Sequence, residues 1–472
     1  MRLTILHTND LHGRVEQLAR IATLVKEIRR EVGAFGGHCV YWDVGDAEEI
    51  SLLESSLTKG SAVMGMLRGA GCEQVALGNA VPIRYGPQAI AGLAERLGRP
   101  LLCANMKDSH TGELVPGLAP YVIETVGSLK IGIIGLTAPT DGYKTFFKLD
   151  VPAPEEVLPK LIEEVRSLGA QTVMLLSHLS SNVDKELAGK ILGLDVIVGG
   201  HDHVALAPPL VVGDTVIAQA GDFGKFLGRL DLELDTASGR VLRHHGELIP
   251  VTEAIAPDAD AQAAFEAERQ RALRMMERMI GVLNEPLEYA EDRECAAGNL
   301  LADALLERVP GAQIALALAG HWSAGLEAGP LSVGVLFAAN RSTANPAKVE
   351  LSGEQIVEFL TRALNVENAA RRLHSLRGGA VGLPHVAGMR ISYDLSTLAL
   401  IDLRFGDEPL HPDRRYIVAA SDFEFAEFVG YLPIPAEQVE YEVPTIMPEV
   451  LEDYIARHSP LNAPYGNRII RM

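Results

Sequence analysis

The chain has 472 residues, a formal net charge of −20 at pH 7, 47% hydrophobic residues and 22% charged residues. This length predicts two or three domains, and the hydrophobic content is ordinary for a globular protein with a full-sized core. The acidic balance argues against nucleic acid and against an anionic membrane as the main partner.

The sequence also bears on the cellular compartment. It holds no apolar run long enough to span a bilayer and no signal peptide, so we expect a cytoplasmic protein without a membrane partner. Four scattered cysteines fit neither a disulfide framework nor a cysteine-based zinc site, and we expect packed free thiols. They are Cys39, Cys72, Cys103 and Cys295.

In the first half of the chain, short apolar runs alternate with segments that have helical spacing. The spacing predicts helices over 15–31 and 154–168. The expected strands are 3–6, 40–42, 75–77, 131–134, 172–176 and 196–198. Strand, polar loop and helix in repeated order are typical of an α/β domain.

The texture of the sequence changes after residue 252. Residues 258–279 are rich in Ala, Glu, Arg and Met and lack Gly and Pro, which predicts one long helix. A second α/β unit begins near 284. Within it, Ser352 and Gln355 form a capping box that predicts the start of a helix extending through 363. Further elements are expected at 298–306 (helix) and at 314–318, 349–351, 389–393, 398–405 and 416–420 (strands). We therefore divide the chain into a first domain (1–252), a linker helix (253–283) and a second domain (284–472).

Seven polar side chains follow the ends of the predicted strands in the first domain. Oxygen and nitrogen ligands without sulfur suit Mn, Zn or Fe(II) rather than a structural zinc site. Seven ligands are too many for one four-coordinate ion and suit two ions that share a bridging carboxylate, for which Asp46 is the natural choice. Two such metals, about 3.5–4 Å apart, are the usual arrangement for attack on phosphorus. The seven residues are Asp10, His12, Asp46, Asn79, His178, His201 and His203.

These motifs resemble those of the 5′-nucleotidase family of calcineurin-like metallophosphoesterases, over nearly the whole chain. The matching segments are 8–13, Gly45-Asp46, Gly78-Asn79, Ser177-His178 and 200–203. The resemblance implies an N-terminal four-layer β-sandwich flanked by helices, a linker helix and a smaller C-terminal α/β domain that binds the nucleoside. It also assigns the ligands to two ions. Asp10, His12, Asp46 and His203 would hold one, and Asp46, Asn79, His178 and His201 the other.

The sequence departs from the family where the family places its general acid. The family continues the Asn of Gly-Asn with a His and places an orienting Asp three residues later. Here Ala80 follows Asn79, and when the segment is aligned backwards from Tyr85-Gly86, Arg84 stands where that Asp would be. The proton donor is therefore absent, which would lower nucleotidase turnover by about 10²–10⁴-fold. Arg84 could stabilise phosphoryl charge as a catalytic residue, or it could be a surface or structural arginine.

The second domain departs from the family in its substrate-binding segments. Ser323 takes the place of a phosphate-binding arginine, and 427–431 read Glu-Phe-Val-Gly-Tyr in place of Gly-Gly-Asp-Gly-Tyr. His321, Trp322, Phe425 and Phe428 are the candidate substrate contacts that replace them, and packing is the alternative role for each.

From these features we expect a dimetal phosphoester hydrolase in which a metal-bound hydroxide attacks phosphorus. Two divalent ions are expected, Mn²⁺ or Zn²⁺ with Fe as a third option. The substrate would be a small phosphorylated molecule, nucleotide-like or another phosphoester, as in nucleotide catabolism. Diesters and activated esters would be preferred because their leaving groups need no proton. The alternative is a catalytically impaired, nucleotidase-like binding protein. The retained ligands favour the hydrolase, and the lost His, Asp and Arg favour the binding protein.

Overall fold

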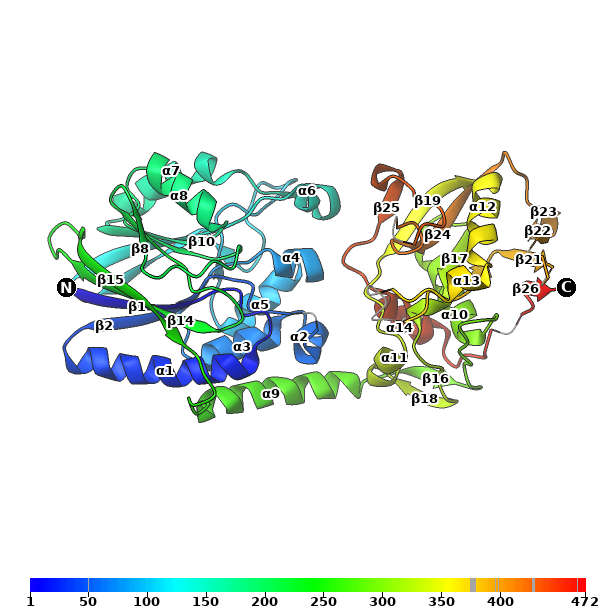
Figure 1. Cartoon of the computed structure of the whole chain (residues 1–472), viewed down its shortest axis with the longest axis horizontal. Helices are drawn as coiled ribbons and strands as arrows, with labels where there is room; N and C mark the ends of the chain where they lie inside the picture. Colours follow the sequence, from blue (N-terminus) through cyan, green and yellow to red (C-terminus); the bar gives the residue numbers. More distant parts are fainter. Residues whose placement is uncertain (50, 374–378, 395, 398, 427–428, 465) are drawn as a thin grey trace. The chain divides into compact units, whose positions relative to one another are not determined.

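The computed structural model describes residues 1–49, 51–373, 379–394, 396–397, 399–426, 429–464 and 466–472. Within these residues the chain divides into two compact units, Met1–Leu273 and Arg274–Met472. Figure 1 shows both, coloured from blue at the N-terminus to red at the C-terminus. None of the described helices is both long enough and apolar enough to cross a membrane.

The first unit contains two large sheets. Among the described residues, the first sheet has the strand order β15-β14-β1-β2-β3. Strands β1, β2 and β3 run parallel to one another, and β14 runs antiparallel to both of its neighbours, β1 and β15. Its strands are β1 (Arg2–Thr8), β2 (His38–Asp43), β3 (Gln74–Val75), β14 (Phe226–Leu234) and β15 (Val241–Pro250).

The second sheet of this unit has the order β12-β13-β11-β10-β8-β7, and its four central strands run parallel. Its strands are β7 (Tyr121–Val126), β8 (Leu129–Thr137), β10 (Thr172–His178), β11 (Val196–Gly199), β12 (Leu210–Val212) and β13 (Thr215–Ala218). Short strands complete the unit, namely β4 (Leu101–Leu102), β5 (Lys107–Asp108), β6 (Leu118–Ala119) and β9 (Leu149–Asp150).

The two sheets pack face to face, and helices cover both outer faces. Strand alternation sends Ile5 of β1 and Leu176 of β10 into the core between the sheets, while Leu6 faces the helices of the first sheet. Figure 1 shows α7 and α8 on one side of the sandwich and α1 and α3 on the other. The predicted four-layer α/β fold is therefore confirmed. The helices are α1 (Val15–Ala34), α2 (Leu53–Leu57), α3 (Ser61–Gly69), α4 (Ala80–Tyr85), α5 (Ala89–Leu97), α6 (Asp141–Phe147), α7 (Pro154–Ser167) and α8 (Ser181–Lys190).

Helix α9 (Ala259–Met276) corresponds to most of the predicted long helix, but it ends earlier than expected. The predicted linker segment 253–283 extends into β16 (Met279–Leu283), which pairs with β18 (Gly329–Ser332). Cross-strand pairing therefore overrides the helical texture at that end. The compact units divide after Leu273. The domain boundaries at 252 and 284 stay predictions.

The second unit is built on one five-stranded and one four-stranded sheet, as far as the described residues show. Their orders are β20-β17-β24-β19-β25 and β23-β22-β21-β26. The strands are β17 (Ile314–Leu318), β19 (Pro346–Ser352), β20 (Pro384–Ala387), β21 (Met389–Tyr393), β22 (Leu400–Phe405), β23 (Glu408–Pro409), β24 (Arg415–Ser421), β25 (Val439–Tyr441) and β26 (Ile469–Arg471). The helical segments are α10 (Ala296–Arg308), η1 (Ala319–His321), α11 (Val333–Ala339), α12 (Gly353–Ala363), α13 (Val366–Ala369), η3 (Ala436–Gln438) and α14 (Met447–His458).

The core of the second unit lies between its main sheet and α12. Phe359 of α12 is buried against Leu316 of β17 and Val418 of β24. The predicted capping box opens α12, with Ser352 Oγ accepting from the Gln355 backbone N–H and Gln355 Oε1 accepting from the Ser352 N–H. Of the expected strand 398–405, Leu398 lies outside the described residues, Ala399 precedes the strand, and the rest forms β22 (Leu400–Phe405).

Candidate metal centre

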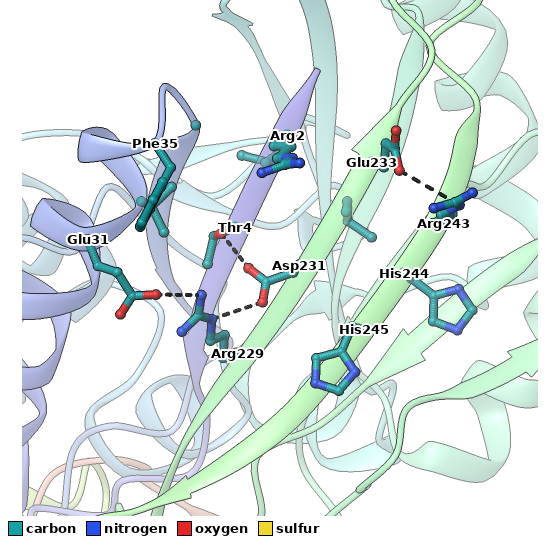
Figure 2. A pocket seen from close by; sticks show the side chains of 14 residues that line it. Arg2, Thr4, Glu31, Phe35, Arg229, Asp231, Glu233, Arg243, His244 and His245 are labelled. Atoms are coloured by element: carbon teal, nitrogen blue, oxygen red, sulfur yellow. Dashed lines mark hydrogen bonds and ion pairs between the residues drawn. The ribbon is translucent and has the colours of Figure 1, made fainter.

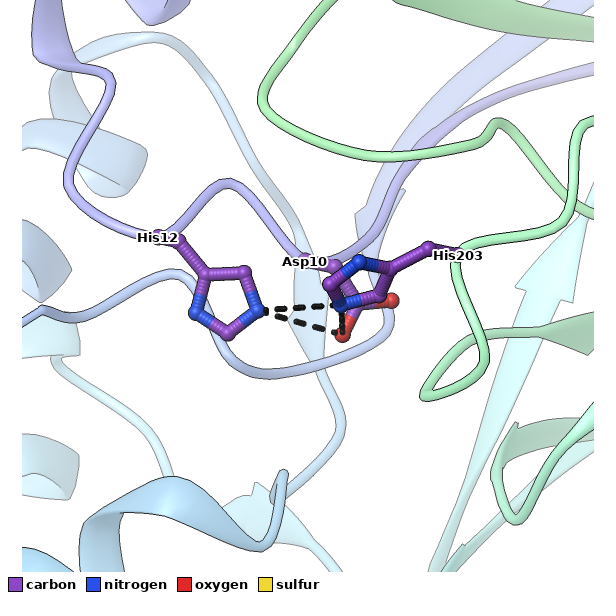
Figure 3. Close-up of side chains that lie close together, drawn as sticks. All are labelled: Asp10, His12 and His203. Atoms are coloured by element: carbon purple, nitrogen blue, oxygen red, sulfur yellow. Dashed lines mark hydrogen bonds and ion pairs between the residues drawn. The ribbon is translucent and has the colours of Figure 1, made fainter.

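Three of the predicted ligands converge at the carboxyl end of β1. Asp10 and His12 lie on the loop after β1, and His203 lies on the loop after β11. His12 Nε2 and His203 Nε2 are 3.2 Å apart, and they lie 3.7 and 3.5 Å from Asp10 Oδ1. Figure 3 shows the two rings and the carboxylate pointing at one another. Two nitrogens and one oxygen directed at a common point form a geometry that one divalent cation can satisfy.

A second group shares Asp10 and adds Asp46 and His178, with ligand atoms within 4.8 Å of one another. His178 Nε2 lies 3.3 Å from Asp46 Oδ2 and 3.1 Å from Asn79 Oδ1. His201 Nδ1 lies 2.9 Å from the same Asn79 oxygen. All seven predicted ligands therefore meet at one edge of the sandwich, where parallel strands end.

The hydrogen bonds of Asp10 and His178 fit a bound cation. Asp10 is fully buried, and its Oδ2 accepts from Asn9 Nδ2 at 2.7 Å and from the His201 backbone N–H at 2.9 Å. Its Oδ1 has no hydrogen-bond partner among the described residues, although such buried oxygens are nearly always satisfied. His178 Nδ1 donates to the Val44 carbonyl at 2.7 Å, which leaves Nε2 free to act as the ligand.

The backbone at this edge is strained. Five of the seven ligand residues have φ in the left-handed region, which costs non-glycine residues about 1–3 kcal/mol each. They are Asp10 (51°), His12 (44°), Asp46 (53°), His201 (84°) and His203 (60°). Strain concentrated on the chemical groups supports a functional role for this loop set.

Two glycines allow the second group to close up. Gly45 has φ of 93°, and a Cβ there would lie 2.6 Å from the Gly78 nitrogen. A Cβ on Gly78 would lie 2.0 Å from Asp46 Oδ1. The glycines that precede Asp46 and Asn79 are therefore steric requirements of the ligand geometry.

The electrostatics pair Asp46 with His178. Burial raises the pKa of Asp46, but the His178 charge and hydrogen bonds from His178 and the Ala80 N–H outweigh it and bring the pKa to about 2. Burial lowers the pKa of His178, and Asp46 more than offsets this, so that this pKa is about 9. The proton on His178 thus occupies the position that a bound metal cation would take.

Two carboxylates that the sequence reasoning missed stand behind the first group. Glu49 Oε2 lies 3.9 Å from His12 Nδ1, and Asp222 Oδ2 lies 3.4 Å from His203 Nδ1. Carboxylates in such positions orient ligand imidazoles. Asp222 directly follows Gln219-Ala220-Gly221, which also resembles the family's sequence after its His-x-His motif and was an available signal. Nothing near Glu49 marked that residue.

Ala80 and Arg84, the two residues near Asn79 that depart from the family pattern, lie at the two ends of α4. Ala80 is buried, and as the first residue of α4 its backbone N–H donates to Asp46 Oδ1 at 2.8 Å. Arg84, at the other end of α4, places one guanidinium nitrogen 3.2 Å from Glu49 Oε1. Arg84 therefore reaches the metal ligands through Glu49, while its side chain stays about one third exposed.

The predicted substrate contacts of the second unit divide into two kinds. His321 and Trp322 are nearly buried but line a cavity of about 450 Å³, together with Ser323. Phe425 is buried, with its ring centroid 6.3 Å from that of Phe359, so it packs in the core. Phe428 lies outside the described residues.

A surface cavity of similar size, about 460 Å³, lies at the opposite end of β1 (Figure 2). Its lining includes Arg2 and Thr4, whereas the ligand residues follow the last residue of that strand. Its Arg229 is paired with Asp231 and with Glu31. This cavity is therefore separate from the metal ligands.

Comparison with known proteins bears on the identity of the fold and the site. Residues 279–436 match the 5′-nucleotidase C-terminal domain. The trifunctional nucleotide phosphoesterase YfkN of Bacillus subtilis is 26% identical over 91% of this chain and 32% of its own length. The 5′-nucleotidase of Bos taurus is 29% identical over 64% of this chain and 59% of its own. The chain thus spans about a third and about three fifths of these two relatives.

The solved structure of a 5′-nucleotidase precursor from Thermus thermophilus covers 100% of this chain and 99% of its own, with a TM-score of 0.54 and 25% identity. By these comparisons the chain is similar to the 5′-nucleotidase family of calcineurin-like metallophosphoesterases, and its second unit matches that family's C-terminal domain. These relatives are named as a nucleotide phosphoesterase and as 5′-nucleotidases. The seven converging side chains stay the candidate metal ligands of this chain, and five of them form the two groups described above.

Proposed function

We propose that this protein is a dimetal phosphoester hydrolase that acts on a small, nucleotide-like phosphoester. The observation that carries the proposal is Asp10, which lies in both ligand groups and whose buried Oδ1 has no hydrogen-bond partner among the described residues. A carboxylate oxygen left unsatisfied in this way costs several kcal/mol unless a cation binds it. The family's nucleotide phosphoesterases support the substrate class.

The ligands would hold two divalent cations, and their nitrogen and oxygen donors favour Mn²⁺ or Zn²⁺. Cations bound there would supply Lewis acidity and lower the pKa of the attacking water. The chain's own groups do the remaining work. Asn9 and the His201 N–H orient Asp10, Asp222 lies where it can orient the imidazole of His203, and Glu49 places a negative charge near His12.

We further propose that this site prefers a leaving group of low pKa. The side chain of Ala80 is only a methyl group, and its backbone N–H already donates a hydrogen bond to Asp46 Oδ1. Arg84 cannot give up a proton at neutral pH, and it faces Glu49. A phosphodiester or an activated ester would lose less from a missing proton donor than an alkyl monoester such as a nucleoside monophosphate.

A substrate panel tests both parts. The protein is reconstituted with Mn²⁺ or Zn²⁺ and assayed on AMP, a cyclic nucleotide, an aryl monoester and an aryl diester, with Asp46→Asn as the control. We expect metal-dependent turnover that falls about 100-fold or more in the variant, because the metals contribute several kcal/mol. Efficient hydrolysis of AMP without hydrolysis of diesters would refute the leaving-group preference. No turnover with bound metals would instead favour a nucleotidase-like binding protein, the alternative that the altered positions 80, 84 and 323 support.

A further inference from the structure

The cavity of the second unit contains a hydrogen-bonded chain of a serine, a histidine and a glutamate. Ser342 Oγ lies 2.7 Å from His321 Nδ1, and His321 Nε2 lies 2.9 Å from Glu424 Oε1. Ser342 and His321 both line the cavity of about 450 Å³. A nucleophile, a base and an orienting carboxylate in this order are the arrangement of a serine hydrolase, here with the roles of the two imidazole nitrogens exchanged.

The carboxylate end of the chain is built to stay ionised. Glu424 is fully buried and accepts from the Leu318 N–H at 2.9 Å and from the Ser421 N–H at 2.8 Å. Burial raises the pKa of Glu424, but His321 and these hydrogen bonds bring it below its usual value. A carboxylate only accepts, so Nε2 of His321 carries a proton, and in the neutral ring the lone pair then lies on Nδ1, which faces Ser342 Oγ.

The serine end is accessible. Ser342 is only partly buried, and its backbone N–H donates to Asn340 Oδ1, which fixes the loop that carries it. Arg341 also lines the cavity, and no carboxylate lies within 4.0 Å of it among the described residues. The cavity size suits a small ligand, and Arg341 favours one with a negative charge.

We propose that Ser342 is an activated nucleophile and that this cavity is a second, metal-independent hydrolytic site for small anionic acyl esters. Ser342 Oγ attacks the ester carbonyl carbon while its proton passes to His321 Nδ1. The bond to the alkoxy group then breaks, and His321 returns the proton to the departing alcohol. Water hydrolyses the acyl-serine by the same route, which releases the acid and restores Ser342.

The arrangement has a purely architectural alternative, in which the three residues only tie η1 to the loop before β19. Reactivity separates the two. A structural hydroxyl in this position would not react with an alkyl fluorophosphonate, whereas an activated serine loses its proton, forms an Oγ–P bond and expels fluoride. The cavity itself offers a matched control, because Ser323 Oγ donates to the backbone carbonyl of Ala339 at 2.9 Å and contacts no base.

The experiment treats the full chain with a fluorophosphonate and maps the adduct by mass spectrometry. We expect one adduct on Ser342, no adduct on Ser342→Ala, unchanged labelling in Ser323→Ala, and a labelling rate about 100-fold lower in His321→Gln. Circular dichroism checks that each variant is folded, and Ser342→Cys provides a second nucleophile whose alkylation by iodoacetamide should also depend on His321. Absence of labelling in the folded wild-type chain, or labelling that survives Ser342→Ala, would overturn the proposal.

Hydrolysis of an anionic aryl ester gives the second readout. We expect turnover that resists EDTA and persists in Asp46→Asn but is lost in Ser342→Ala. Phosphoester hydrolysis should show the reverse dependence. Failure of either site is therefore distinguishable from failure of the other.

Discussion

A single methyl group at Ala80 shapes the chemistry expected at the metal centre. Its backbone N–H holds Asp46, so the residue keeps a structural contact with the ligand set while its side chain offers no proton. Arg84 turns to Glu49, the carboxylate behind His12. These contacts are thus organised around holding the candidate ligands, and neither residue 80 nor residue 84 offers a proton to a leaving alcohol.

Restoring the family's residues at both positions should therefore change substrate preference. In the double variant Ala80→His/Arg84→Asp, we expect the ratio of AMP to aryl diester hydrolysis to rise about 100-fold or more, since a positioned acid contributes that much. Steady-state kcat/KM on the two substrates measures it, and Arg84→Asp alone serves as the control. An unchanged ratio in a folded, metal-loaded double variant would contradict the role assigned to position 80.

Gly78 offers a steric test of the ligand geometry. In Gly78→Ala, the new Cβ would meet Asp46 Oδ1 at 2.0 Å and must displace the carboxylate. We expect bound metal, measured by mass spectrometry of the isolated protein, to fall by half or more. Gly92→Ala is the matched control, because that glycine lies exposed within α5 with no atom near its Cβ. That change should keep the metal and raise stability by about 0.5–1 kcal/mol.

Among the elements, those that the sequence predicted well are the ones fixed by local signals. The strand runs before Asp10, Asp46 and His201 end where polar, glycine-containing loops begin, and parallel strands must bring their carboxyl ends together. The convergence of ligands within each sheet therefore followed from periodicity and order, whereas the meeting of the two sheets at this edge depends on how the sheets pack. The early end of α9 did not, because β16 depends on pairing with β18, about fifty residues further along the chain. Glu49 and Glu424 were missed for the same reason, since their partners are distant in sequence.

The capping box of α12 is a local signal whose energy can be measured. Ser352→Ala removes the acceptor of the Gln355 N–H and should lower the stability of the second unit by about 1 kcal/mol. Urea unfolding followed by Trp322 fluorescence in a Trp42→Phe background reports this unit alone, because the chain has two tryptophans, one in each unit. Ser352→Asp, which keeps an acceptor, should restore most of the loss.

For the whole molecule, buried neutral histidines set the response to acid. Burial lowers the pKa of His7 in the first unit and of His385 in the second to about 4 in each case. Each ring binds a proton more readily when the chain is unfolded, at a pKa near 6.5. The stability that these two neutral histidines contribute is therefore fully present above about pH 6.5 and is lost as the pH falls towards 4.

His385 gives the cleaner test, since its Nε2 accepts from the Cys295 N–H at 3.0 Å and must stay unprotonated. Between pH 7.5 and pH 5 we expect the free energy of unfolding of the second unit to fall by about 2 kcal/mol, and we expect this loss to be absent in His385→Gln. The same tryptophan fluorescence, recorded over urea gradients at both pH values, measures the difference. His411→Gln, at an exposed position, should follow the wild type, and equal pH slopes in all three proteins would refute the assignment.

The left-handed backbone of the five strained ligands also restricts how this site can be lost by mutation. Asn, Asp, His and Gly tolerate that conformation far better than other residues, and a β-branched side chain pays a full steric penalty there. At five positions, the side chains that can bind a metal are thus nearly the same as those that tolerate a left-handed backbone. The positions are Asp10, His12, Asp46, His201 and His203. A descendant that abandons metal chemistry but keeps the fold should carry Asn or Gly at these positions. Val or Ile there would signal that the loops themselves had been rebuilt.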